Sequence, residues 1–133
     1  MAYTICILLV ASLFVLSNAI PVNPGIVKGV IHKKSGETRG IVNAALGMSV
    51  DAAMKAATTE EQKVCIKAAK DEAFKDANLQ INQTTRALVT MAESHAAEMS
   101  NVTLDDVNKA VDAMFSSIKQ KWLPEKIAEI QKC

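Results

Sequence analysis

The sequence has 133 residues, of which 50% are hydrophobic and 22% charged, and 15 basic against 14 acidic residues leave a net charge of +1. The two signs alternate along the chain, and this pattern argues against nucleic-acid binding. The length is typical of a single domain with one modest core.

The first 19 residues predict a cleaved secretory signal peptide. An apolar run at residues 5–16 is shorter than the roughly 20 residues that a membrane-spanning helix needs. Ser17 and Ala19 place small residues three and one before a cut after Ala19. No later segment is apolar enough to stop transfer. We therefore expect a secreted, extracellular protein and not an integral membrane protein.

Removing the signal peptide also changes the cysteine count. Cys6 leaves with the signal, so the mature chain keeps Cys65 and Cys133. Two thiols in an oxidising compartment predict one disulfide. An intrachain bond is favoured because it would hold the C-terminal helix in place, and the alternative is a pair of interchain bonds across a homodimer.

Two sequons predict a covalent modification. Asn82-Gln83-Thr84 and Asn101-Val102-Thr103 both match the acceptor pattern for N-glycosylation in a secreted chain. Asn82 lies away from the apolar positions of its segment, and Asn101 lies in a link between two predicted helices. Both are expected to be exposed and glycosylated.

Residues 20–40 are predicted to form a flexible N-terminal arm, because they contain prolines and glycines without a sustained period. At most, residues 26–31 would form a short helix or strand. The basic stretch at residues 28–39 is interpreted as a solvated loop, with weak contact to anionic lipid or glycan as the alternative. The ordered domain is expected to begin near Ile41.

Residues 41–133 predict an all-α domain, a small bundle of four to five helices. The residue types favour helix and no alternating strand pattern appears. In the first predicted helix, residues 41–57, apolar positions cover about 240° of the helical wheel. Such a helix is either central in the bundle or meets a second partner. The residues proposed to face that partner, lipid surface or ligand are Val42, Leu46, Ala53 and Ala57.

The next helix is predicted to begin after Thr58 or Thr59, each of which fits a capping box. An unbroken helix over residues 60–99 would be about 60 Å long at 1.5 Å per residue. We therefore expect a break at residues 78–85, which are rich in Asn and Thr, with an extended antiparallel rod as the alternative. The positions expected to face inward are Ile66, Ala69, Ala73, Phe74, Ala77, Ile81, Leu88, Met91, His95 and Met99.

The last long helix is predicted over residues 104–122, where the apolar positions share one face and Thr103 can cap the free amides. Pro124 is expected to break or restart it. A short final helix would then run to Cys133.

The residue types give little support for catalysis. The mature chain has two histidines, and it has no nucleophile motif, glycine-rich phosphate loop or zinc-like spacing. We predict no enzyme activity, no metal site and no cofactor. His95, within an apolar stripe, is interpreted as a hydrogen-bonded core or boundary residue.

Methionines and large apolar side chains favour binding of a hydrophobic small molecule or lipid, because methionine adapts to irregular apolar shapes. The alternatives are an extracellular protein–protein interaction or effector protein, with a homodimer as one form of it, and a membrane-active defence protein. The candidate ligand-binding residues are Leu46, Met48, Met54, Met91, His95, Met114 and Phe115.

The predicted mature protein is a small secreted helical chain with two well-separated cysteines, Cys65 and the terminal Cys133. In these respects it resembles the secretoglobins. The resemblance covers cysteine spacing and helix count, and no sequence motif contributes to it. It implies a disulfide-linked carrier of hydrophobic ligands. The predicted arm at residues 20–40 has no counterpart in that family.

Overall fold

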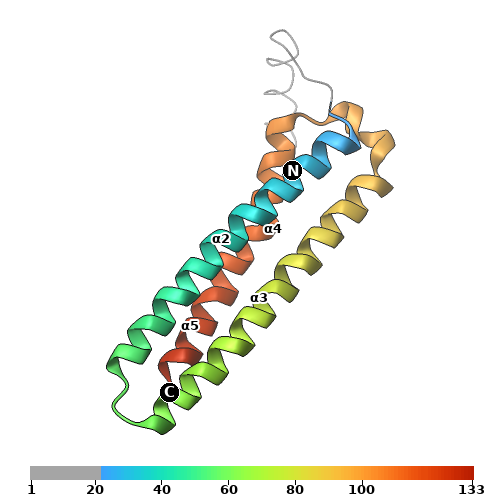
Figure 1. Ribbon diagram of the computed structural model, residues 1–133. Helices are drawn as coiled ribbons and strands as arrows, with labels where there is room; N and C mark the ends of the chain where they lie inside the picture. The colour runs from blue at the N-terminus through green and yellow to red at the C-terminus, as the bar shows by residue number, and fades with distance from the viewer. Residues whose placement is uncertain (1–21) are drawn as a thin grey trace.

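The computed structural model describes residues 22–133, in which three long helices lie side by side as an antiparallel rod (Figure 1). The first two are α2 (Pro24–Ala56) and α3 (Glu60–Ser94). A 3-10 helix, η1 (Ala96–Asn101), leads into the third. That third helix is continuous through α4 (Leu104–Ser117), the π-helical turn η2 (Ile118–Trp122) and α5 (Leu123–Gln131). The all-α prediction is confirmed, but the expected four to five helices are wrong.

Helix α2 begins at Pro24, so the prediction of a flexible arm up to residue 40 is wrong where the structure describes it. Asn23 caps the helix, since its Oδ1 accepts a hydrogen bond from the Ile26 amide at 3.0 Å. Proline suits the first turn, where an amide would have no partner within the helix. Burial of apolar side chains such as Ile31 offsets the cost of about 1 kcal/mol that each helical glycine carries. The predicted signal peptide lies outside the described residues.

Helix α3 runs through residues 78–85 without the expected break, so the alternative of an antiparallel rod is the correct one. Asn78 and Asn82 accept hydrogen bonds from the Arg39 guanidinium of α2 rather than competing for the backbone of their own helix. The Thr85 hydroxyl donates to the Ile81 carbonyl at 2.7 Å and lies 3.0 Å from the Ser35 hydroxyl. These contacts hold the polar side chains in place while the helix continues.

The capping predictions for α3 and α4 are confirmed. Thr59 and Gln62 form a capping box at the start of α3, where Thr59 Oγ1 accepts from the Gln62 amide at 3.1 Å. Thr103 caps α4 by accepting from the Asp106 amide at 3.2 Å, and the Asp106 carboxylate accepts from the Thr103 amide in return. Each box satisfies amides that the first turn leaves without partners.

The last helix continues past Pro124, so the predicted break is wrong. A proline ring clashes with the carbonyl four residues before it in a regular α-helix. Here the preceding turn is widened into η2, in which the Leu123 amide donates to the Ile118 carbonyl, five residues back. The wider turn also carries Trp122, whose indole N–H donates to Asp76 of α3 at 2.8 Å. The helix therefore passes the proline with only a local change of pitch.

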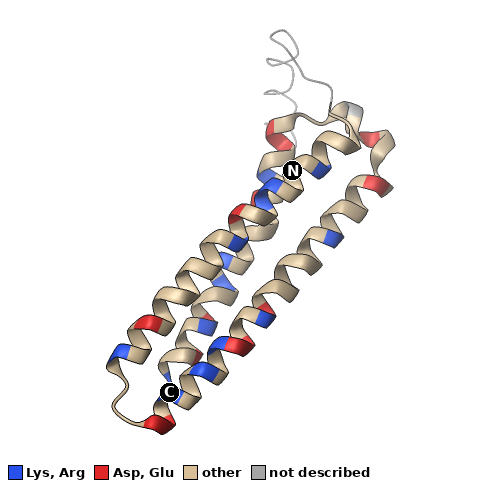
Figure 2. Ribbon diagram, in the orientation of Figure 1, with Lys and Arg blue, Asp and Glu red and all other residues tan. Residues whose placement is uncertain are grey.

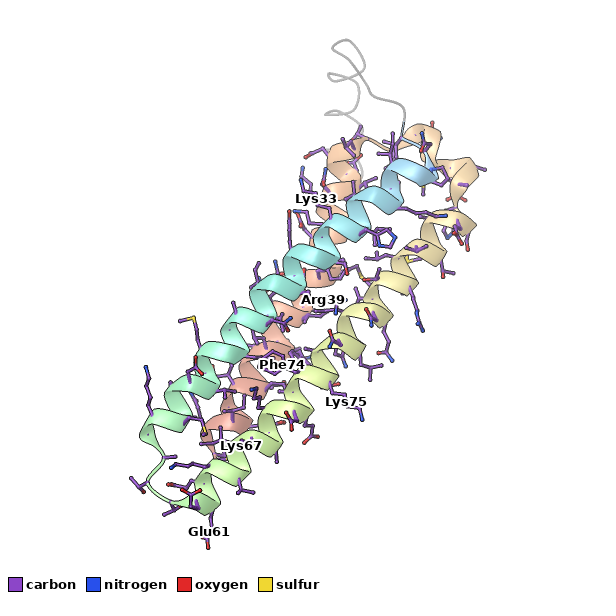
Figure 3. The ribbon with its side chains drawn as sticks, viewed as in Figure 1. Lys33, Arg39, Glu61, Lys67, Phe74 and Lys75 are labelled. Atoms are coloured by element: carbon purple, nitrogen blue, oxygen red, sulfur yellow. A yellow bond between two sulfur atoms is a disulfide. The ribbon has the colours of Figure 1, made fainter. Side chains whose placement is uncertain are left out.

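The core is a continuous apolar layer along the axis of the rod. Its largest fully buried side chains come from all three helices: Ile31, Val42, Leu46, Ile81, Phe115 and Ile130. Figure 3 shows Phe74 between the helices, packed against this layer. Because every long helix contributes, no one of them would be expected to keep its place without the other two.

Charged side chains tie the helices together at their margins. The Lys34 ammonium lies 3.0 Å from Asp112 of α4, and Lys28 lies 2.6 Å from Glu93 of α3. The hydrogen bond to Asp112 raises the pKa of Lys34. Both signs are spread over all three helices (Figure 2). Within residues 22–133, no helix combines the length and the apolar character that crossing a bilayer requires.

Candidate functional site

The structure does not bring the seven predicted ligand-binding residues together. Leu46 and Phe115 are fully buried in the core, and Met54 is half-buried against it. These three side chains are occupied in packing. Leu46 and Phe115 offer no free surface to a ligand, and Met54 offers only part of its side chain.

The other four predicted residues lie outside the core on different helices. Met48 of α2 is 74% exposed, while Met91 of α3 and Met114 of α4 are about half exposed. His95 ends α3, and its Nδ1 lies 3.3 Å from the Glu98 carboxylate. The expectation that Met91 and His95 face inward is wrong, because the buried face of α3 turns gradually around the helix and passes through Leu88 and Ala92 instead.

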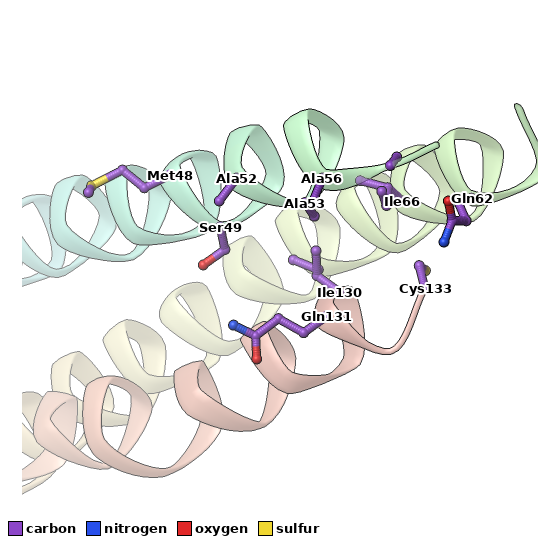
Figure 4. Close-up of a pocket in the computed structure, with 11 residues that line it drawn as sticks. Met48, Ser49, Ala52, Ala53, Ala56, Gln62, Ile66, Ile130, Gln131 and Cys133 are labelled. Carbon is purple, nitrogen blue, oxygen red and sulfur yellow. The ribbon is translucent and has the colours of Figure 1, made fainter. Parts of the chain in front are cut away.

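An apolar groove lies instead near the disulfide, between the C-terminal half of α2 and α5 (Figure 4). Its volume is about 490 Å³. Helix α3 contributes Ile66 to it, and α5 contributes Ile130. We call it the disulfide-end groove. Its lining residues are Met48, Ser49, Ala52, Ala53, Ala56, Ala57, Gln62, Ile66, Ile130, Gln131 and Cys133.

Alanines create the space in this groove. Ala52 and Ala56 are exposed and Ala53 is half-buried, so α2 presents only methyl groups toward α5 over this stretch. Opposite them, the Ile130 side chain is buried and supplies an apolar surface. A pair of helices that meet through such short side chains leaves room that larger residues would fill.

The disulfide closes this end of the rod. Cys65 and Cys133 are bonded within one chain, with a Cα–Cα distance of 5.7 Å. The intrachain prediction is therefore confirmed and the interchain alternative is wrong. The bond fastens the end of the chain to α3, and Cys133 is itself part of the groove. The position of α5 against the groove thus depends on this bond.

The polar groups of the groove are neutral. Ser49, Gln62 and Gln131 line it, and none of the lining side chains carries a charge. The Gln62 Oε1 atom already accepts hydrogen bonds from the amides of Thr58, at 2.8 Å, and Thr59, at 3.2 Å. Its amide NH₂ group is the part that remains for a ligand. Such a lining suits a ligand that is apolar over most of its length and has an uncharged polar group at one end.

The face of α2 that was proposed to meet a partner, lipid surface or ligand is only partly occupied within the chain. Val42 and Leu46 are fully buried in the core, and Ala53 and Ala57 line the groove. Residues 22–133 contain no group of three or more His, Cys, Asp or Glu side chains that could hold a metal ion. Asn82 and Asn101, the two sequon residues, are both exposed.

Sequence reasoning missed most of the groove. The available signal was the alanine-rich run at residues 52–57, but the distance between α2 and α5 depends on how the final helix is held. Comparison of the chain with protein-family models, curated proteins and solved structures finds no match. The function must therefore be argued from the chemistry of the groove.

Proposed function

We propose that the protein is a secreted, non-catalytic binder of a neutral apolar small molecule or lipid, which it holds in the disulfide-end groove. The observation that carries the proposal is the groove itself, whose volume of about 490 Å³ falls within the range of small-molecule sites. Its walls are mainly alanine, isoleucine and methionine side chains, with three neutral polar groups. An apolar ligand gains free energy from leaving water at such a surface.

Three features support an extracellular location. The predicted signal peptide at residues 1–19 provides the route, and the disulfide between Cys65 and Cys133 is typical of an oxidising compartment. Two sequons are exposed on the folded surface. A disulfide that fixes one side of the groove would keep the site formed outside the cell.

Filling the groove should abolish binding. Ala56→Trp places a large ring at the groove from the exposed end of α2, and Gln131→Trp does so from α5. We expect each variant to weaken the binding of a fluorescent acyl-chain probe by roughly tenfold or more, because the ring occupies the apolar volume. Fluorescence titration of the secreted protein measures the effect.

Ala87→Trp is the matched control, because Ala87 is an exposed alanine of α3 outside the groove. It should bind the probe as the unmodified protein does, and circular dichroism should show the same helix content for all variants. If the unmodified protein shows no saturable probe binding, or if both groove-filling variants bind normally, the proposal is wrong.

We also propose N-linked glycans on Asn82 and Asn101. The Asn82 Oδ1 atom accepts a hydrogen bond from Arg39 at 2.9 Å, and glycosylation at Nδ2 leaves that oxygen free to do so. Asn101 ends η1, at the end of the rod away from the groove (Figure 1). Neither glycan would cover the groove.

Mass spectrometry before and after enzymatic deglycosylation tests both sites. We expect two glycans on protein from a secreting eukaryotic cell, and one in each of the variants Asn82→Gln and Asn101→Gln. An unchanged mass after deglycosylation of the unmodified protein would rule out the modification.

A further inference from the structure

Helix α2 carries a further row of apolar side chains, which are exposed except for Ala45, half-buried against the core. Ile41 is 50% exposed and Met48 is 74% exposed. At 100° per residue, they share one side of the helix with Ala44, Ala45 and Ala52. We call these five residues the α2 outer face. Residues 40–50 of α2 carry no charged side chain, as Figure 2 shows, and Ala52 lies just beyond them, after Asp51.

Two opposite charges lie on the same line of α2, one beyond each end of the outer face. Glu37 and Lys55 are 18 residues apart, which is five turns of 3.6 residues and about 27 Å at 1.5 Å per residue. Glu37 keeps about half of its side chain exposed beside Lys34, at 3.5 Å, and Lys55 is exposed. Along this line the order is acidic, apolar, basic. Arg39 is bonded to Asn78 and Asn82 of α3 instead, and the exposed Asp51 lies about 80° around the helix from Ile41.

We propose that the α2 outer face binds the same face of a second copy of the chain, with the two α2 helices antiparallel about a twofold axis. In this arrangement Glu37 of each copy lies opposite Lys55 of the other, so the pairing forms twice. The large side chains also fall opposite small ones: Ile41 lies opposite Ala52, and Met48 lies opposite Ala45. Both charge and shape are self-complementary.

A parallel arrangement lacks these properties. It would place Glu37 opposite Glu37 and Met48 opposite Met48, which combines repulsion with poor packing. A contact through one helix from each copy lies at the small end of protein interfaces. We therefore expect a reversible dimer whose population rises with concentration. Met48 and Ala52 belong both to the α2 outer face and to the lining of the disulfide-end groove, whereas Glu37, Ile41 and Lys55 do not line the groove. Substitutions at these three positions therefore test the dimer without changing the groove lining.

Charge reversal tests the antiparallel register. In Glu37→Lys and in Lys55→Glu, each dimer would contain two like-charge contacts in place of two ion pairs. We expect each single variant to raise the dissociation constant of the dimer by roughly tenfold. The double variant should have the dissociation constant of the unmodified protein, because exchanging the two charges restores opposite charges at each contact. Sedimentation equilibrium of the secreted protein with its disulfide intact gives these constants.

Mixing provides a second test on the same preparations. An equimolar mixture of the two single variants should form heterodimers at concentrations where each variant alone is monomeric, since both contacts in the mixed pair are attractive. If the single reversals leave the dissociation constant unchanged, the proposed register is wrong. If the unmodified protein stays monomeric throughout the micromolar range, the dimer is wrong.

Ile41→Glu and Leu79→Glu form a matched pair that tests the apolar part of the face. Leu79 of α3 is 52% exposed, almost the same as Ile41, and lies on another helix. Ile41→Glu should raise the dissociation constant by more than tenfold while leaving the melting temperature and the probe affinity of the monomer unchanged. Leu79→Glu should change none of the three. Equal weakening by both substitutions would contradict the assignment to α2.

Discussion

Phe115→Ala is expected to lower the free energy of unfolding by about 4 kcal/mol. Phe115 is fully buried in α4, within the layer where all three long helices meet. Its removal leaves a cavity that long, well-packed helices can close only in part. Urea denaturation followed by circular dichroism measures the change as a lower midpoint with a similar slope.

Met114→Ala is the matched control for this substitution, because Met114 is the neighbouring residue and is 45% exposed. We expect it to change the free energy of unfolding by less than about 1 kcal/mol. Comparable losses in the two variants would contradict the assignment of Phe115 to the core and of Met114 to the surface. The same result would reopen the prediction that both residues contact a ligand.

Removing the disulfide has the second large expected effect. The sequence separation of 68 residues between Cys65 and Cys133 gives a chain-entropy contribution of about 4 kcal/mol to stability. Cys65→Ala with Cys133→Ala should lower the free energy of unfolding by up to that amount. It should also weaken probe binding, because the end of α5 is no longer fastened beside the groove.

The contrast between stability and binding makes this experiment specific. Phe115 lies outside the groove lining, so Phe115→Ala should leave probe affinity nearly unchanged wherever the protein remains folded. The double cysteine variant should reduce both quantities under the same conditions. If the disulfide could be removed without loss of stability or probe affinity, the role assigned to it in holding α5 beside the groove would be wrong.

Helix starts were the most predictable part of the fold. Thr59 and Thr103 are capping residues because their side-chain oxygens reach amides in the first turn, and this depends on a few adjacent residues. The start of α2 carries an equally local signal, Asn23 followed by Pro24, but the glycines after it favour a loop. Local chemistry thus indicates where each of the three long helices begins.

The interior of each helix was less predictable, because contacts with other helices decide it. Arg39 of α2 donates hydrogen bonds to Asn78 and Asn82 of α3 across the helix pair, and Figure 3 shows Arg39 between these two helices. Low helix propensity predicted a break at residues 78–85. The local sequence of α3 does not contain Arg39, the partner that keeps this segment helical. At Pro124 the outcome depended on a π-helical turn that Trp122 and Asp76 stabilise from different helices.

The candidate site was the least predictable. An apolar stripe on a helical wheel shows which residues are apolar, but it does not show where two helices leave space between them. Met48 is the one member of the predicted set that lines the groove, while Leu46 on the same helix is fully buried. The alanines that make the groove are individually unremarkable, and only their position opposite Ile130 gives them a role.

Native mass spectrometry of the secreted protein, purified without denaturation, tests the central claim most directly. We predict a deglycosylated mass that exceeds the chain mass by one neutral apolar molecule, and loss of that excess in Ala56→Trp but not in Ala87→Trp. A protein that carries no added mass and takes up no acyl-chain probe would contradict the assignment of the disulfide-end groove as a ligand site.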